Sequence, residues 1–149
     1  MHKLILFIIL ALALLAGVAQ VRTAGAGFAE VDIVVPMSNN AGPLSTEDVR
    51  RIFVGEKSSW GGGKHITVLM LAPGQPERAV ILREVFKMSE SDYTKYFLQA
   101  AFTGRVQAAP KDLSSAEQMK ARLAANPNAI GYLRKENVDD SVRVLLRLR

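Results

Sequence analysis

The sequence predicts an α/β domain built on a central sheet. Two observations lead to this prediction. Apolar stretches rich in β-branched residues, typical of buried strands, alternate along the chain with stretches that carry helix start and stop signals. Their order, β-α-β-α-α-α-β-β, is that of a sheet flanked by helices. The 149 residues are enough for one domain and hardly enough for two.

The first strand and the first helix are predicted from adjoining stretches. Val31–Met37 (VDIVVPM) is apolar and β-branched, and a turn-forming sequence, SNNAGP, follows it. The next stretch, LSTEDVRRIFVG, has Ser45 or Thr46 as its candidate N-cap and two acidic residues in the first turn. Gly55 supplies the stop signal of this helix.

The second strand and two more helices follow. His65–Pro73 (HITVLMLAP) is nearly all apolar after Thr67, which indicates a strand covered on both faces. In GQPERAVILREVFKM, Pro76 stands near the first helical position, where its missing N–H is not needed. The helix SESDYTKYFLQAAFTG starts at Ser89 and stops at Gly104. The residues of this helix that we expect to face the core are Tyr93, Tyr96, Phe97, Ala100 and Ala101.

A last helix and two strands complete the domain. The stretch SSAEQMKARLAANP begins like a capping box, in which Ser114 or Ser115 pairs with Glu117 or Gln118. The sequence Asn-Pro-Asn ends it, because proline disfavours helical continuation. The short apolar stretches AIGYL and SVRVLLRL are predicted to be strands.

Residues 1–29 are predicted to be a signal peptide with a flexible start, and residues 30–149 to be the domain. A single lysine precedes an apolar run that ends at Ala19, with small residues near its end, as in a secretory signal. Cleavage after Ala19, Ala26 or Ala29 fits this pattern. The alternative is an uncut membrane anchor, but the run of 16 residues is shorter than the roughly 20 that span a bilayer. The expected location is therefore the periplasm or the cell exterior.

Charge and cysteine content argue against several classes of function. Residues 1–29 hold two basic residues and no acidic one, so the net charge of +5 falls to +3 without them. The remaining basic residues are spread among acidic ones, without the clustering or interleaved aromatics of a nucleic-acid site. The chain contains no cysteine, so neither disulfides nor thiol chemistry is available to it.

The glycine-rich stretch Gly55–Lys64 (GEKSSWGGGK) invites comparison with a nucleotide-binding loop. The P-loop pattern G-x-x-x-x-G-K-[ST] requires a glycine at position 58 and a hydroxyl residue after the lysine. Ser58 and His65 occupy those positions, so the pattern is not met. The stretch is predicted to connect the first helix to the second strand, with Gly61–Gly63 supplying the backbone freedom for a sharp reversal.

No catalytic site, metal site or cofactor is expected. His65 is the one histidine outside the predicted signal peptide, and no residue around it has metal-ligand spacing. We interpret it as an exposed histidine at a strand edge. The acidic pairs Glu47–Asp48 and Asp139–Asp140 fall at a helix start and in a turn, without the apolar surroundings that raise a catalytic pKa.

Two helix starts are candidates for binding a small anion through backbone amides. One follows the first strand and offers Ser38 and Asn39, although acidic residues come soon after. The other, APGQPERA, offers the amides of Gly74 and Gln75 and the guanidinium of Arg78, although a carboxylate lies next to it. Taken alone, each is better explained as an ordinary helix cap.

Five short motifs follow one another along the chain. They are Ile52-Phe53-Val54-Gly55, Trp60-Gly61-Gly62-Gly63, Phe102-Thr103-Gly104, the segment from Pro110 to Ser115, and Ala129-Ile130-Gly131-Tyr132. In this order and spacing, the chain from about Val31 to Leu148 resembles the phosphate-binding-protein-like domain of phosphate ABC transporter substrate-binding proteins.

This resemblance implies a single lobe of the type 2 periplasmic-binding-protein fold, with a central mixed sheet flanked by helices. It also implies solute binding, with phosphate or another small oxyanion at the helix start Gly74–Arg78, assisted by Ser38 and Asn39. The chain departs from the family's hydroxyl-rich loop here, since no serine or threonine occurs from Val68 to Lys87. Tight phosphate binding is therefore not expected.

The sequence thus predicts an exported, non-enzymatic binding domain with weak affinity for an anion. The alternative is a protein-interaction module of the cell envelope that has lost anion binding. In that alternative, a face that a second lobe would cover recruits an envelope protein or a second copy, through Tyr132, Leu133 and the aromatic helix Tyr93–Phe102. Nucleic acid is not an expected partner, and membrane contact is expected only through an uncut signal segment.

Overall fold

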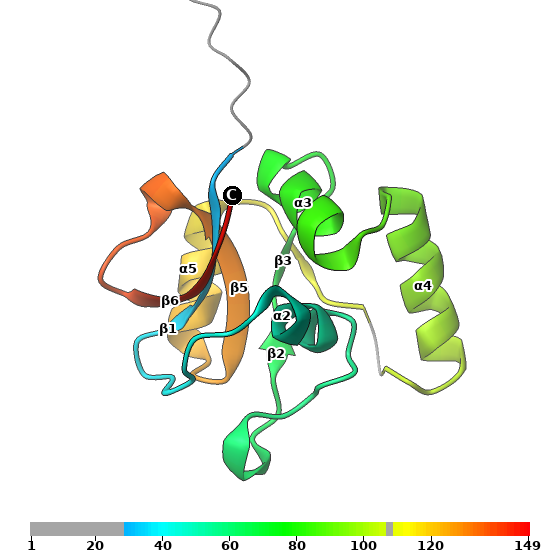
Figure 1. Ribbon diagram of the computed structural model, residues 1–149, viewed down its shortest axis with the longest axis horizontal. Helices are drawn as coiled ribbons and strands as arrows, with labels where there is room; N and C mark the ends of the chain where they lie inside the picture. The colour runs from blue at the N-terminus through cyan, green and yellow to red at the C-terminus, as the bar shows by residue number, and fades with distance from the viewer. Residues whose placement is uncertain (1–28, 107–108) are drawn as a thin grey trace, which may run out of the picture.

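The computed structural model describes residues 29–106 and 109–149 (Figure 1). The strands are β1 (Val31–Pro36), β2 (Thr67–Val68), β3 (Met70–Leu71), β4 (Asp112–Leu113), β5 (Ala129–Arg134) and β6 (Val142–Leu148). The α-helices are α2 (Thr46–Phe53), α3 (Pro76–Ile81), α4 (Glu90–Phe102) and α5 (Ala116–Ala125). A π-helical turn, η2 (Leu82–Phe86), continues α3, and 3-10 turns form η1 (Gly61–Gly63) and η3 (Lys135–Asn137). Apart from Ala29, the predicted signal peptide lies outside the described residues.

Four strands form a mixed sheet in the order β2-β5-β1-β6. Strand β1 is antiparallel to both of its neighbours, whereas β2 is parallel to β5. Val31 lies opposite Arg134 on one side and Leu148 on the other, so the start of β1 and the C-terminal end of the chain lie together (Figure 1). The predicted α/β fold with a central mixed sheet flanked by helices is confirmed.

The predicted second strand, His65–Pro73, is divided into two short strands. Thr67–Val68 pairs with β5, and the N–H of Leu69 still donates to the carbonyl of Ile130 at 2.9 Å. From there Met70–Leu71 pairs with β4 in a separate two-stranded sheet. This change of pairing partner is not predictable from the sequence, because β4 is only two residues long and lies in a polar stretch.

The two faces of β5 are covered by different helices. The fully buried ring of Tyr132 lies 6.5 Å, between centroids, from the ring of Phe53 in α2. The adjacent Gly131 faces Met119 of α5 instead, because successive residues of a strand point to opposite faces. Helix α5 therefore packs on one face of the sheet. On the other face, Phe53 of α2 packs against Tyr132 and against Phe86 of η2.

Serine side chains cap three helices, in agreement with the sequence signals. Ser45 is the N-cap of α2 and forms a capping box with Asp48. Ser89 caps α4, and Ser115 caps α5 by accepting a hydrogen bond from the N–H of Gln118. Each cap satisfies a backbone donor that has no partner within its own helix, so the helix starts are determined locally.

Helix α4 presents an aromatic face to the core. Tyr93, Phe97 and Ala100 are buried, as predicted, and the rings of Tyr93 and Phe86 meet edge to face with centroids 5.1 Å apart. The prediction that Ala101 also faces the core is wrong, because Ala101 is exposed. Each helical residue is rotated by about 100° from the one before it, and this step carries Ala101 beyond the edge of the buried face.

We predict that Gly131→Ala destabilises the domain by about 1–3 kcal/mol, the usual range for overpacking a core. An added Cβ at this position would lie 2.5 Å from Sδ of Met119 and 3.5 Å from Cβ of Leu69. The free energy of unfolding in urea measures the effect. Gly42→Ala is the control, since a Cβ there meets nothing within 4 Å. In the Gly131→Ala background, Met119→Ala should cost less than it does alone; equal losses would contradict the proposed contact.

Candidate functional site

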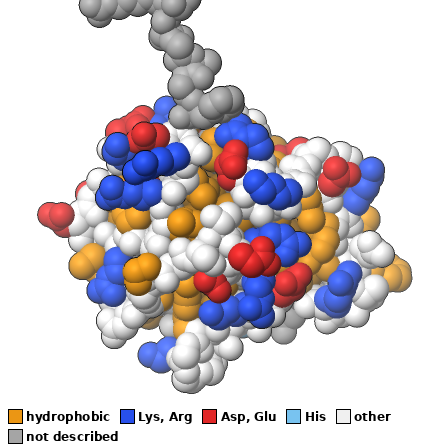
Figure 2. Space-filling model, in the orientation of Figure 1, with side chains coloured by type: hydrophobic (Ala, Val, Ile, Leu, Met, Phe, Trp, Pro, Cys, Tyr) orange, Lys and Arg blue, Asp and Glu red, His pale blue; other side chains and the backbone are white. Residues whose placement is uncertain are grey.

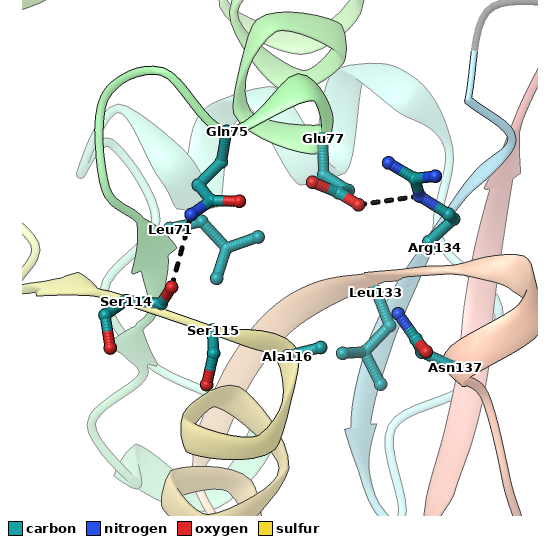
Figure 3. Close-up of a pocket in the computed structure, with 9 residues that line it drawn as sticks. All are labelled: Leu71, Gln75, Glu77, Ser114, Ser115, Ala116, Leu133, Arg134 and Asn137. Atoms are coloured by element: carbon teal, nitrogen blue, oxygen red, sulfur yellow. Dashed lines mark hydrogen bonds and ion pairs between the residues drawn. The ribbon is translucent and has the colours of Figure 1, made fainter.

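A cleft of about 180 Å³ opens where the starts of α3 and α5 meet the end of β5 (Figure 3). We call it the α3–α5 cleft. Its lining residues are Leu71, Gln75, Glu77, Ser114, Ser115, Ala116, Leu133, Arg134 and Asn137. The predicted residue Gln75 lies in this cleft, next to Gly74, whose φ of +89° allows the tight turn before α3.

Two helix N-termini border the α3–α5 cleft. Gln75 is the N-cap residue of α3, and Ser115 is the N-cap of α5. The Nε2 atom of Gln75 donates to the carbonyl of Ser114 at 3.2 Å, so the two helix starts are joined across the cleft (Figure 3). Because helix N-termini carry unpaired N–H groups and a partial positive charge, this end of the cleft favours an anion.

The cationic group of the cleft is already paired. Nε of Arg134 lies 2.7 Å from Oε1 of Glu77, and its Nη1 lies 3.4 Å from Oε1 of Glu136. The hydrogen bond and the charge of Glu77 raise the pKa of the Arg134 guanidinium. An incoming anion therefore meets a neutralised arginine and competes with two carboxylates for it, which weakens the positive potential of the cleft.

Arg78, the predicted cationic ligand, points into the protein rather than into the cleft. Its side chain is 3% exposed, and its Nη1 donates to the carbonyl of Leu71 at 2.7 Å and to Oδ1 of Asp112 at 2.8 Å. Its Nε lies 3.0 Å from Oε2 of Glu90, and its guanidinium lies 4.8 Å from the centroid of the Tyr93 ring. The residues of the helix start Gly74–Arg78 therefore point in different directions. Its first residues border the cleft, whereas the side chain of Arg78 lies in the protein interior.

Burial and ion pairing act in opposite directions on the pKa of Arg78. Burial by itself lowers the pKa of Arg78, but the hydrogen bond to Glu90 and the charge of Asp112 raise it, and the net shift is upward. A buried charge needs such compensation because water is no longer available to solvate it. Burial also raises the pKa of the neighbouring Tyr93, whose hydroxyl has no hydrogen-bond partner among the described residues.

The other two predicted residues, Ser38 and Asn39, lie at a different place. They line a second pocket of about 240 Å³ together with Trp60, Lys64 and Asn128. Asn39 is buried, and its Nδ2 donates to the carbonyl of Pro127 at 2.8 Å, just before β5 begins. The α3–α5 cleft lies at the opposite end of β5, roughly 15–20 Å away at the usual rise of a strand. The structure therefore does not bring Ser38 and Asn39 together with Gly74 and Gln75.

Four polar residues of the cleft are not predicted as site residues from the sequence: Ser114, Ser115, Arg134 and Asn137. The two serines have the pattern of a helix cap, although their segment belongs to one of the family motifs. Arg134 and Asn137 follow the AIGYL strand, and no local pattern connects them with α3, which lies more than 50 positions earlier. Only the packing of α3 against the end of β5 places Arg134 beside Glu77.

His65, the remaining chemical candidate, lines neither of the two pockets described above. His65 is exposed and forms an isolated bridge with Ser59, as expected for a strand-edge histidine. Among residues 29–106 and 109–149, no three His, Cys, Asp or Glu side chains lie close enough together to hold a metal ion. In the same ranges, no helix has both the length and the apolar character needed to cross a membrane.

The comparisons with known proteins agree with this architecture. Neither a protein-family model nor a curated protein matches the sequence. Among solved structures, an ABC-type phosphate transport receptor from Vibrio cholerae matches with a TM-score of 0.58 and 21% identity, over 78% of this chain and 45% of the receptor. A Clostridium perfringens protein, described as a phosphate ABC transporter substrate-binding protein and solved with phosphate, matches with a TM-score of 0.63 and 19% identity, over 78% and 44% of the two chains.

A third match, PstS from Borrelia burgdorferi, has a TM-score of 0.57 and 14% identity, over 78% of this chain and 46% of that one. The chain thus spans less than half the length of each of these proteins. At such identities the likeness is one of fold. The described domain has the fold of a single lobe of a type 2 periplasmic-binding protein.

We predict that Arg78→Met lowers the free energy of unfolding by about 3 kcal/mol. This is the low end of the range for breaking a buried ion pair, because the carboxylates of Glu90 and Asp112 are nearly half exposed and can regain water. Urea unfolding measures the loss. The matched control, Arg122→Met, removes an exposed arginine of α5 and should change stability by less than about 0.5 kcal/mol. Similar losses for both variants would show that Arg78 has no special structural role.

Proposed function

We propose that the chain is an exported, non-catalytic binding domain that binds phosphate or another small oxyanion weakly at the α3–α5 cleft. The observation that carries this proposal is the meeting of two helix N-termini beside Arg134 in a single cleft. Backbone amides of a helix start bind anions without any catalytic side chain. The fold, shared with proteins described as phosphate-binding receptors, supports a role in binding rather than in chemistry.

The same cleft explains why the binding is weak. Glu77 is nearly buried and holds Arg134, and Pro76 removes one backbone donor from the first turn of α3. Arg78, which the sequence of this helix start suggested as a ligand, is committed to Glu90 and Asp112. The N–H of Gln75 already donates to the carbonyl of Ala72 at 3.3 Å. An anion is thus left with the Gly74 amide, the start of α5 and a shared guanidinium. We expect dissociation constants in the millimolar range rather than the micromolar range.

We place this binding outside the cytoplasm. The proposal rests on the secretory pattern of residues 1–29, a lysine followed by an apolar run and small residues. It is also consistent with a chain that contains no cysteine and takes its stability from a packed core. Processing at Ala19, Ala26 or Ala29 would leave β1 intact, because that strand begins at Val31.

Isothermal titration with phosphate and with sulfate at low salt tests the anion site. We predict weak binding that Arg134→Gln reduces and that Glu77→Gln strengthens about fivefold. The latter change removes a negative charge that repels the anion, beside the partly exposed Arg134, and this is worth about 1 kcal/mol. Added sodium chloride should weaken the binding in all variants, because salt screens the interaction.

Arg122→Gln serves as the control, since it removes an exposed positive charge on α5 without touching the cleft. It should leave the anion affinity unchanged. Circular dichroism must show that every variant remains folded before the affinities are compared. If wild-type protein and Glu77→Gln both give no heat with millimolar anion, the proposed binding site is wrong.

A second candidate function is a protein-interaction module of the cell envelope, and the surface of α4 favours it. Leu98 and Phe102 are 69% and 92% exposed, unusual values for large apolar side chains in a structured helix. By contrast, Tyr132 and Leu133 are fully buried. These two residues are therefore unavailable as surface contacts, contrary to the role that the sequence alone suggested for them.

A further inference from the structure

Helix α4 carries an apolar stripe that nothing in the described domain covers. The stripe consists of Leu98, Ala101 and Phe102, and with Ser91, Thr94 and Lys95 it makes up what we call the α4 outer face; all six residues are exposed. At about 100° per residue, this face lies on the side of the helix opposite the buried Tyr93, Phe97 and Ala100. The outer face thus contributes nothing to the core of its own molecule.

The charges at the two ends of α4 are complementary to each other. Its first turn contains the exposed acidic residue Asp92, next to Glu90, whose carboxylate is held by Arg78, and Arg105 follows its C-terminal end. Two copies of α4 packed antiparallel bring the acidic start of each helix beside the basic end of the other. The helix dipoles then also oppose each other, which is the favourable arrangement.

From these features we propose that the α4 outer face binds the same face of a second copy of this chain, antiparallel and with two-fold symmetry. The axis passes through Leu98, so that the two Leu98 side chains meet. Thr94 then faces Phe102 of the second copy, and Lys95 lies beside the same ring, where its ammonium group makes a cation–π contact. A two-fold axis repeats each of these contacts, as in an isologous interface.

One helical stripe is a small interface. It covers far less than the roughly 800 Å² per partner of a standard stable complex, so the association is weak and reversible. This inference rests on the second candidate function, the interaction module, and is independent of anion binding, since α4 contributes no residue to the α3–α5 cleft. Figure 1 shows α4 at one end of the long axis of the molecule, with α3 and β3 between it and α5.

Because the chain has no native cysteine, single cysteines report the pairing directly. In the protein purified as cells process it, Leu98→Cys should form a disulfide-linked dimer on mild oxidation. Ser91→Cys should not, because the two Ser91 positions lie roughly 21 Å apart in the antiparallel pair, at 1.5 Å per helical residue. A disulfide requires Cα atoms within about 7 Å. Mixing Ser91→Cys with Arg105→Cys should again give a cross-linked dimer.

Sedimentation velocity over a range of concentrations measures the same association without a cross-link. Leu98→Lys with Phe102→Lys should lower the association constant at least tenfold. Met37→Lys is the matched control, because Met37 is a 49% exposed apolar residue outside α4, and it should have no effect. Cross-linking of Ser91→Cys as fast as Leu98→Cys, or a protein that stays monomeric at millimolar concentration, would overturn the proposal.

The outcomes also separate this inference from the function on which it rests. If the chain stays monomeric while cross-linking in cells recovers an envelope protein through another face, the interaction role stands and the α4 pairing is wrong. If neither a second copy nor an envelope protein is captured, both are wrong. Anion titration of the Leu98→Lys, Phe102→Lys variant should match the wild type in every case.

Discussion

The guanidinium of Arg78 joins parts of the chain that no local pattern connects. This guanidinium belongs to α3. It donates hydrogen bonds to the carboxylates of Glu90, at the start of α4, and Asp112, in β4. It also donates to the carbonyl of Leu71 at the end of β3. The N–H of Leu71 donates in turn to the hydroxyl of Tyr132 in β5. Both backbone groups of Leu71 are thus satisfied by side chains. The buried guanidinium of Arg78 and the buried carbonyl of Leu71 each need a hydrogen-bond partner, because no water reaches them, and each supplies the partner of the other.

This network also determines what the anion site can do. The guanidinium of Arg78 faces the interior instead of a ligand at the start of α3, and it joins two helices and two strands there. Its neighbour Glu77 turns toward the cleft and pairs with Arg134. The residues that hold the fold together therefore lower the positive potential of the cleft, and two helix N-termini are left as the main attraction for an anion.

The face of the domain shown in Figure 2 is of mixed character. On the face shown in Figure 2, Lys and Arg side chains are interspersed with Asp and Glu, and hydrophobic side chains emerge between them. Such a surface favours neither nucleic acid nor a strongly charged partner. The α4 outer face differs from it by combining large apolar side chains with oppositely charged helix ends, and no residue of α4 lines the α3–α5 cleft. Anion binding and protein association would therefore be separable properties of one small domain.

The sequence by itself determined the fold class, most helices and the strands β1, β5 and β6, because these depend on local signals. The helix caps formed by Ser45, Ser89 and Ser115 depend on neighbouring residues alone. The spacing of apolar residues that identifies a strand is likewise contained in the strand itself. Only the tertiary structure decided that the second strand changes partner at Leu69, that Arg78 turns inward, and that Ser38 and Asn39 lie at the far end of β5. These features depend on which residues meet across long separations in sequence. A side chain such as Arg78 has the same local pattern whether it faces a ligand or two carboxylates, and packing alone chooses between them.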